Sequence, residues 1–160
     1  MKKKKCTITS HDALILVSCG LTGLFFAFVL NHYWAQIQLK NEPLEFPFSF
    51  SFFYVLCFFA YFLQGLAYVF LSKQSKRTPY GRSVVFFWTQ FFLSVIWLQL
   101  FFGLKMFGLS LFTLFVSFMI LLGAYYFFKI IRKAAAFMLV PAGALIAFVA
   151  MLNIWFFLIR

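Results

Sequence analysis

Five apolar stretches alternate with short polar ones along the chain. They run over about 12–31, 47–71, 82–102, 108–128 and 134–159, and each has about 20 residues or a few more. About 20 apolar residues in an α-helix cross the roughly 30 Å hydrocarbon layer of a membrane. The pattern therefore predicts an all-α integral membrane protein, a single five-transmembrane-helix bundle over residues 1–160.

The composition agrees with a membrane protein. The chain is 65% hydrophobic and 11% charged, whereas soluble domains have about 25% charged residues. A net charge of +11 can indicate a nucleic-acid partner, but here the cations lie in the short connections between apolar stretches, as in membrane proteins. We therefore expect lipid contacts and no nucleic-acid partner.

The cations also predict an orientation. Eleven of the 14 Lys and Arg residues fall in three regions that share one side of a five-helix topology. These are the lysines at 2–5, then Lys73, Lys76, Arg77 and Arg82, and then Lys129, Arg132 and Lys133. The other side has Lys40, Lys105 and Arg160. The positive-inside rule then predicts a cytoplasmic N-terminus in the cell membrane, which we expect to be bacterial.

The N-terminal apolar stretch has two alternatives, a signal peptide and a lipoprotein signal. The basic start suits a signal peptide, but the apolar run continues to Leu30 and no small-residue cleavage site closes it. The motif LVSC, which ends at Cys19, resembles a lipoprotein box, but the apolar residues before it are few and the run continues beyond it. We expect an uncleaved membrane anchor.

The third apolar stretch contains QFFLSVIWLQLFF, residues 90–102, with an unusual set of polar positions. At helical spacing Gln90, Ser94, Trp97 and Phe101 share one face, while Gln99 is on the opposite face. With tyrosines on the second stretch, this face can line an aromatic pocket with a few polar groups. The alternative is that it only packs against other helices, since small and polar residues hold membrane helices together.

Lines of small residues also occur, among them Gly20, Gly23 and Ala27 in the first stretch, and Gly143, Ala147 and Ala150 in the last. We expect these lines to serve close helix packing.

No catalytic pattern is visible. His11, His32 and the three carboxylates lie near helix ends or in the first connection, and no charge is placed in the middle of an apolar stretch. Metal sites need clustered ligands and ion paths need buried charges. We expect no catalytic residues, no metal and no resident cofactor, and we regard an enzyme as the less favoured class.

The residues of the third stretch resemble the TspO/MBR family, which includes tryptophan-rich sensory proteins and translocator proteins. The family pattern Q-L-x-L-N-x-x-W-x-x-L-F-F is matched at Gln90, Trp97, Phe101 and Phe102, with Ser94 where asparagine is usual. The last stretch, PAGALIAFVAMLN, is similar to P-Y-x-x-W-x-x-F-x-x-x-L-N and matches at Pro141, Phe148, Leu152 and Asn153. Tyr61 with Gly65, and Tyr33 with Trp34, resemble further family pairs.

The resemblance implies a homodimer that binds a planar hydrophobic ligand inside the bundle, a tetrapyrrole such as a porphyrin or a sterol-like molecule, as a sensor or carrier. The implied ligand-binding residues are Tyr33, Trp34, Tyr54, Tyr61, Gln90, Ser94, Trp97, Phe101, Leu145 and Phe148. Family aromatic positions are replaced here by Cys57, Ala142 and Leu145. Light-dependent porphyrin breakdown, known in the family, is therefore only an alternative, as are a purely structural protein and a small transporter.

Overall fold

The structure is a computed structural model that describes residues 9–38, 50–73 and 80–159. In these residues the chain forms helices that closely follow the predicted stretches. They are α1 (Ser10–Gln38), α2 (Phe50–Ser72), α3 (Tyr80–Leu98), the π-helix η1 (Gln99–Gly103), α4 (Phe107–Ile131), α5 (Lys133–Phe137) and α6 (Val140–Ile159). The predicted all-α class is confirmed.

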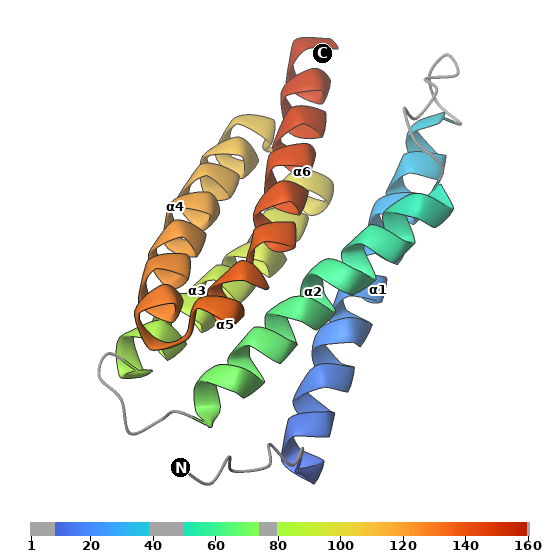
Figure 1. The fold of residues 1–160 in the computed structure, drawn as a ribbon. Helices are drawn as coiled ribbons and strands as arrows, with labels where there is room; N and C mark the ends of the chain where they lie inside the picture. The colour runs from blue at the N-terminus through green and yellow to red at the C-terminus, as the bar shows by residue number, and fades with distance from the viewer. Residues whose placement is uncertain (1–8, 39–49, 74–79, 160) are drawn as a thin grey trace, which may run out of the picture.

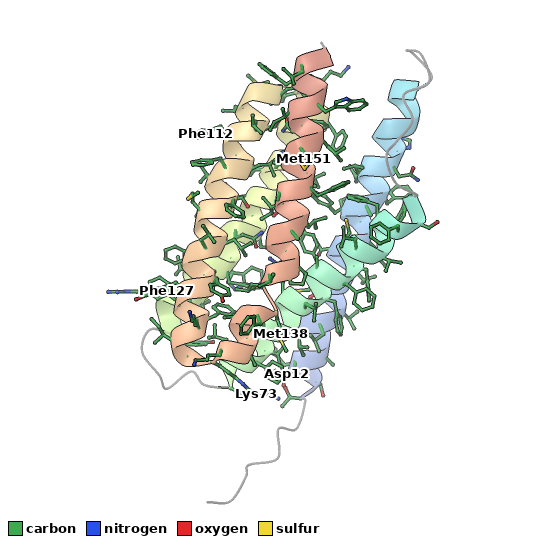
Figure 2. All side chains as sticks on the ribbon, turned by 45° about the horizontal axis from the view of Figure 1, so that its top comes forward. Asp12, Lys73, Phe112, Phe127, Met138 and Met151 are labelled. Atoms are coloured by element: carbon green, nitrogen blue, oxygen red, sulfur yellow. The ribbon has the colours of Figure 1, made fainter. Side chains whose placement is uncertain are left out.

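Five segments are long and apolar enough to cross a membrane, and they coincide with the five predicted stretches. Large apolar side chains point outward from the bundle. Phe112 and Met151, on the outside of α4 and α6 in Figure 2, are 62% and 70% exposed. In water such a surface would aggregate, whereas in lipid it is the solvated face. The chain is an integral membrane protein.

The helices form two groups (Figure 1). The helices α1 and α2 run side by side as an antiparallel pair, and α3, α4 and α6 pack together as the second group. The short helix α5 and α6 connect this group to α2, and α2 packs far more extensively on α1 than on α3. The site described below lies where the two groups meet.

Glycines allow α1 and α2 to approach closely. A Cβ atom on Gly23 would lie 2.6 Å from the backbone oxygen of Cys57, and one on Gly65 would lie 3.0 Å from Cβ of Cys19. A Cβ on Gly20 would meet the ring of Phe58 at 2.9 Å. Contacts this short leave no room for a side chain, so the prediction that the small residues of the first stretch serve helix packing is confirmed.

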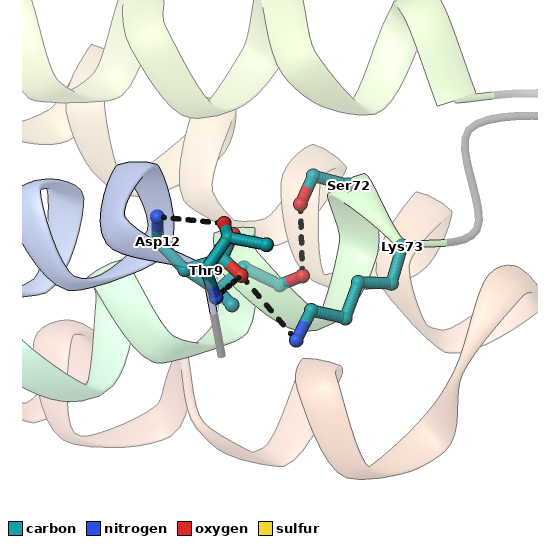
Figure 3. A network of polar contacts seen from close by, with 5 residues as sticks. Thr9, Asp12, Ser72 and Lys73 are labelled. Carbon is teal, nitrogen blue, oxygen red and sulfur yellow. Dashed lines mark hydrogen bonds and ion pairs between the residues drawn. The ribbon is translucent and has the colours of Figure 1, made fainter. Parts of the chain in front are cut away.

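Polar contacts join helices at the end of the bundle where α1 begins (Figures 2 and 3). The backbone N–H of Thr9 donates to Oδ2 of Asp12 at 2.9 Å, and the N–H of Asp12 donates to Oγ1 of Thr9 at 3.3 Å. This reciprocal pair is a capping arrangement for the free N–H groups of a helix start. Asp12 Oδ2 also lies 3.4 Å from Nζ of Lys73 at the end of α2, and Arg132 lies 4.4 Å from the ring centre of Phe70.

Two helix ends differ from the prediction. The first helix continues to Gln38 instead of ending near Asn31, and it includes the backbone of Tyr33 and Trp34, which were expected in the following connection. The last stretch is divided into α5 and α6, with Met138 and Leu139 between them. Proline has no N–H and its ring collides with the carbonyl four residues earlier. Pro141 therefore accounts for the end of α5 at Phe137.

The third predicted helix ends in a π turn, which was also not predicted. The N–H of Leu104 donates to the carbonyl of Gln99, five residues earlier, at 3.0 Å. Both Phe101 and Phe102 are buried, although neighbours on an α-helix point about 100° apart. The wider turn thus brings two adjacent rings into the core. Lys105, in the link to α4, has a φ of 54°.

Candidate functional site

A small cavity lies where α1 and α2 meet α3, α4 and α6. Apolar side chains make most of its wall, and a few polar ones gather on one part of it. Its lining residues are Phe26, Tyr61, Gln64, Gln90, Ser94, Trp97, Leu114, Ala142, Leu145, Ile146 and Val149. The space that they enclose is about 20 Å³, enough for roughly one water molecule.

The polar part of the wall is a hydrogen-bonded cluster between α2 and α3. Nε2 of Gln64 donates to Oε1 of Gln90 at 2.9 Å, and Nε2 of Gln90 donates to Oγ of Ser94 at 3.3 Å. The hydroxyl of Ser94 donates to the backbone carbonyl of Gln90 at 3.1 Å, and Tyr61 lines the same cavity. We call Tyr61, Gln64, Gln90 and Ser94 the amide cluster. All four side chains are buried, so each polar atom needs such a partner.

The aromatic part of the wall is built around Trp97. Its ring stacks on Phe26 of α1 at 5.5 Å and on Phe101 of η1 at 5.2 Å between centroids, with interplanar angles of 26° and 25°. Phe102 meets it edge-on at 5.9 Å. The indole is 2% exposed. Trp97 therefore joins both helix groups, and a planar ligand that stacks on it must displace one of these rings.

The indole N–H of Trp97 is held by Asn153 of α6. The Asn153 amide is oriented with its oxygen toward Trp97 because this gives both amide atoms partners. Oδ1 then accepts from Nε1 of Trp97 at 3.2 Å, and Nδ2 donates to the carbonyl of Phe107 at 3.2 Å. Ser110 Oγ lies 2.6 Å from the same amide. This contact fixes the angle of the indole ring against the cavity.

The structure brings half of the predicted site residues to the cavity. Five of them line it, namely Tyr61, Gln90, Ser94, Trp97 and Leu145. Phe101 stacks on Trp97 outside the lining.

The other predicted residues lie elsewhere. Tyr54 accepts from Nδ2 of Asn31 at 3.4 Å, and the ring of Phe148 packs 5.9 Å from that of Phe53. The side chains of Tyr33 and Trp34 lie outside the described residues.

Gln64 is the polar cavity residue that the sequence analysis missed. It is 2% exposed and joins α2 to α3 through Gln90. The signal was present, because Gln64 follows Tyr61 by three residues and so shares its helix face. An amide in the middle of an apolar helix is also rare enough to mark a buried contact.

The arrangement suits reversible binding better than catalysis. Amides and hydroxyls donate and accept hydrogen bonds but do not titrate near neutral pH. Among residues 9–38, 50–73 and 80–159, no three His, Cys, Asp or Glu side chains come together as a metal site would require. The wall offers an apolar, aromatic surface with a few polar groups, as small-molecule sites usually do.

Comparison with known proteins identifies a family. The model of the TspO/MBR family matches residues 13–158, which include all five membrane-spanning segments. No curated protein matches the chain.

Proposed function

Because this chain belongs to the TspO/MBR family, we propose that it binds a planar hydrophobic ligand, a tetrapyrrole or a sterol-like molecule, inside the bundle and acts as a membrane sensor or carrier. The ligand sits between the two helix groups, against Trp97 and the amide cluster. The basic end of the bundle faces the cytoplasm, because Arg82, Lys129 and Lys133 lie at helix ends on the same side as the start of α1.

One observation carries the proposal, the amide cluster on the wall of an otherwise apolar cavity. The glycines of α1 and α2 serve helix packing, and none of them is among the residues that line the cavity. The cluster instead places hydrogen-bonding groups next to a cavity and beside an indole, and ligand sites are built in this way.

Binding requires the bundle to open. Sites for drug-sized ligands measure about 300–1,000 Å³, against about 20 Å³ here. The natural place to open is between the two groups, since α2 contacts α3 far less than it contacts α1. The pair formed by α1 and α2 then moves away from α3 and α6, and the ligand replaces the contact of Phe26 with Trp97.

The experiment is a titration of the protein in lipid nanodiscs with protoporphyrin IX, followed by its absorbance, with empty nanodiscs as the control. We expect a saturable change at micromolar concentrations, equivalent to about −8 kcal/mol. Trp97→Phe keeps an aromatic ring but loses the N–H, and we expect it to bind more weakly. A linear change equal to that of empty nanodiscs would show that the porphyrin enters only the lipid, and the proposal would fail.

A further inference from the structure

The polar groups at the cavity are all uncharged. Its described lining contains two glutamines, a serine and a tyrosine, and otherwise only apolar side chains and Trp97. Glutamine and serine side chains can donate and accept, so they match a carbonyl, a hydroxyl or an ester equally well. They provide no positive charge to balance an anion.

The described cations that flank the cluster on α3 and α2 are too far along the chain to provide one. Arg82 precedes Gln90 by eight residues on α3, which is about 12 Å along a helix. Lys73, directly after α2, follows Gln64 by nine residues, which is about 14 Å by the same measure. It is also paired with Asp12. The amide cluster therefore lies near the middle of the α3 span, Tyr80–Gly103, and the cations lie at its ends.

A carboxylate at this depth would be strongly disfavoured. An unpaired ion in an apolar interior loses its hydration and gains no counter-charge, so it is excluded or becomes protonated. A neutral acceptor meets no such barrier. It can take over the hydrogen bond that Nε2 of Gln64 now donates to Gln90, so that the number of hydrogen bonds is conserved when the helices part.

From this geometry we infer that the site selects its ligand by charge. The part of the ligand that enters between α2 and α3 is uncharged, a carbonyl, hydroxyl or ester group, and it binds by exchanging the hydrogen bond between Gln64 and Gln90. Any carboxylate on the ligand stays at the membrane surface. This inference rests on the proposed function, and it makes Gln64 a determinant of specificity.

The test compares protoporphyrin IX, which carries two carboxylates, with its dimethyl ester, which is neutral and has the same ring. Both are titrated against the full chain in nanodiscs, with lipid-only nanodiscs to subtract partitioning. Only the ester has a neutral acceptor that can exchange the bond between Gln64 and Gln90, so we expect it to bind at least about threefold more tightly than the diacid. Methionine has a shape similar to that of glutamine but makes no strong hydrogen bonds. Gln64→Met should therefore weaken the binding of the ester by about tenfold.

The outcomes separate the two proposals. If the diacid binds saturably and the ester is less than about threefold tighter, the neutral selection is wrong and the proposed function stands. If the ester binds as expected but Gln64→Met leaves its affinity unchanged, the bond exchange at Gln64 is wrong. If neither porphyrin saturates, the proposed function fails, and the selection with it. Because the first comparison uses the unmodified chain, it does not depend on whether the variant folds.

Discussion

Trp97→Ala is expected to lower the free energy of unfolding by about 3–5 kcal/mol, the range for removing a fully buried tryptophan. The substitution deletes the stacking contacts with Phe26 and Phe101 and leaves a cavity between the two helix groups. It also removes the N–H donor to Asn153. Since Trp97 touches α1, η1 and α6, its loss should weaken the whole bundle and not one helix pair.

The measurement is unfolding in mixed micelles with increasing SDS. The matched control is Trp88→Ala, because Trp88 is on the same helix but is 39% exposed. We expect the free energy of unfolding of the control to fall by roughly 1 kcal/mol, as for the loss of a partly exposed aromatic contact. Equal losses for the two variants would mean that Trp97 is not the packing centre. Because of this structural role, Trp97→Phe is the better variant for binding studies.

Gly23→Leu is expected to lower the free energy of unfolding by about 3 kcal/mol or more, the upper end of overpacking effects. Even the first added atom would lie 2.6 Å from the backbone oxygen of Cys57, and backbone cannot move aside as a side chain can. The helices α1 and α2 would have to separate, which also pulls Tyr61 and Gln64 away from α3.

The control for Gly23 is Gly81→Leu, since a Cβ on Gly81 would meet nothing within 4 Å. Leucine favours helices over glycine by roughly 0.8 kcal/mol, so this variant should be neutral or slightly more stable. Thermal melts of both variants in the same detergent measure the difference. A melting temperature unchanged by Gly23→Leu would show that α1 and α2 are not in the close contact described.

The sequence predicts the helices and the face of α3 that turns inward. Apolar length alone defines the five spans, and the few polar residues of α3 show which side avoids lipid. Gln90, Ser94 and Trp97 are buried while Gln99 on the opposite face is exposed, as helical periodicity predicted. The inward face of α3 can be predicted in this way because a polar side chain in lipid costs free energy unless it has a hydrogen-bond partner.

What the sequence does not provide are the features that depend on contacts between helices. The π turn at Gln99–Gly103 accompanies the ring contact of Trp97 with Phe102, five residues apart, and no local propensity marks it. The partner of Gln90 is an amide 26 residues earlier, which only the crossing of α2 and α3 brings near. Tyr54 and Phe148 share helices with cavity residues but point to other neighbours.

The most direct test of a ligand site against the amide cluster is the affinity for protoporphyrin IX of Gln90→Leu and Gln99→Leu, measured side by side. Both variants exchange a glutamine for leucine in the α3–η1 segment, but only Gln90 lines the cavity. We expect Gln90→Leu to weaken binding by at least about tenfold, or 1.4 kcal/mol, and Gln99→Leu to leave it unchanged. Equal affinities for the two variants would contradict the account, because the ligand would then be held elsewhere.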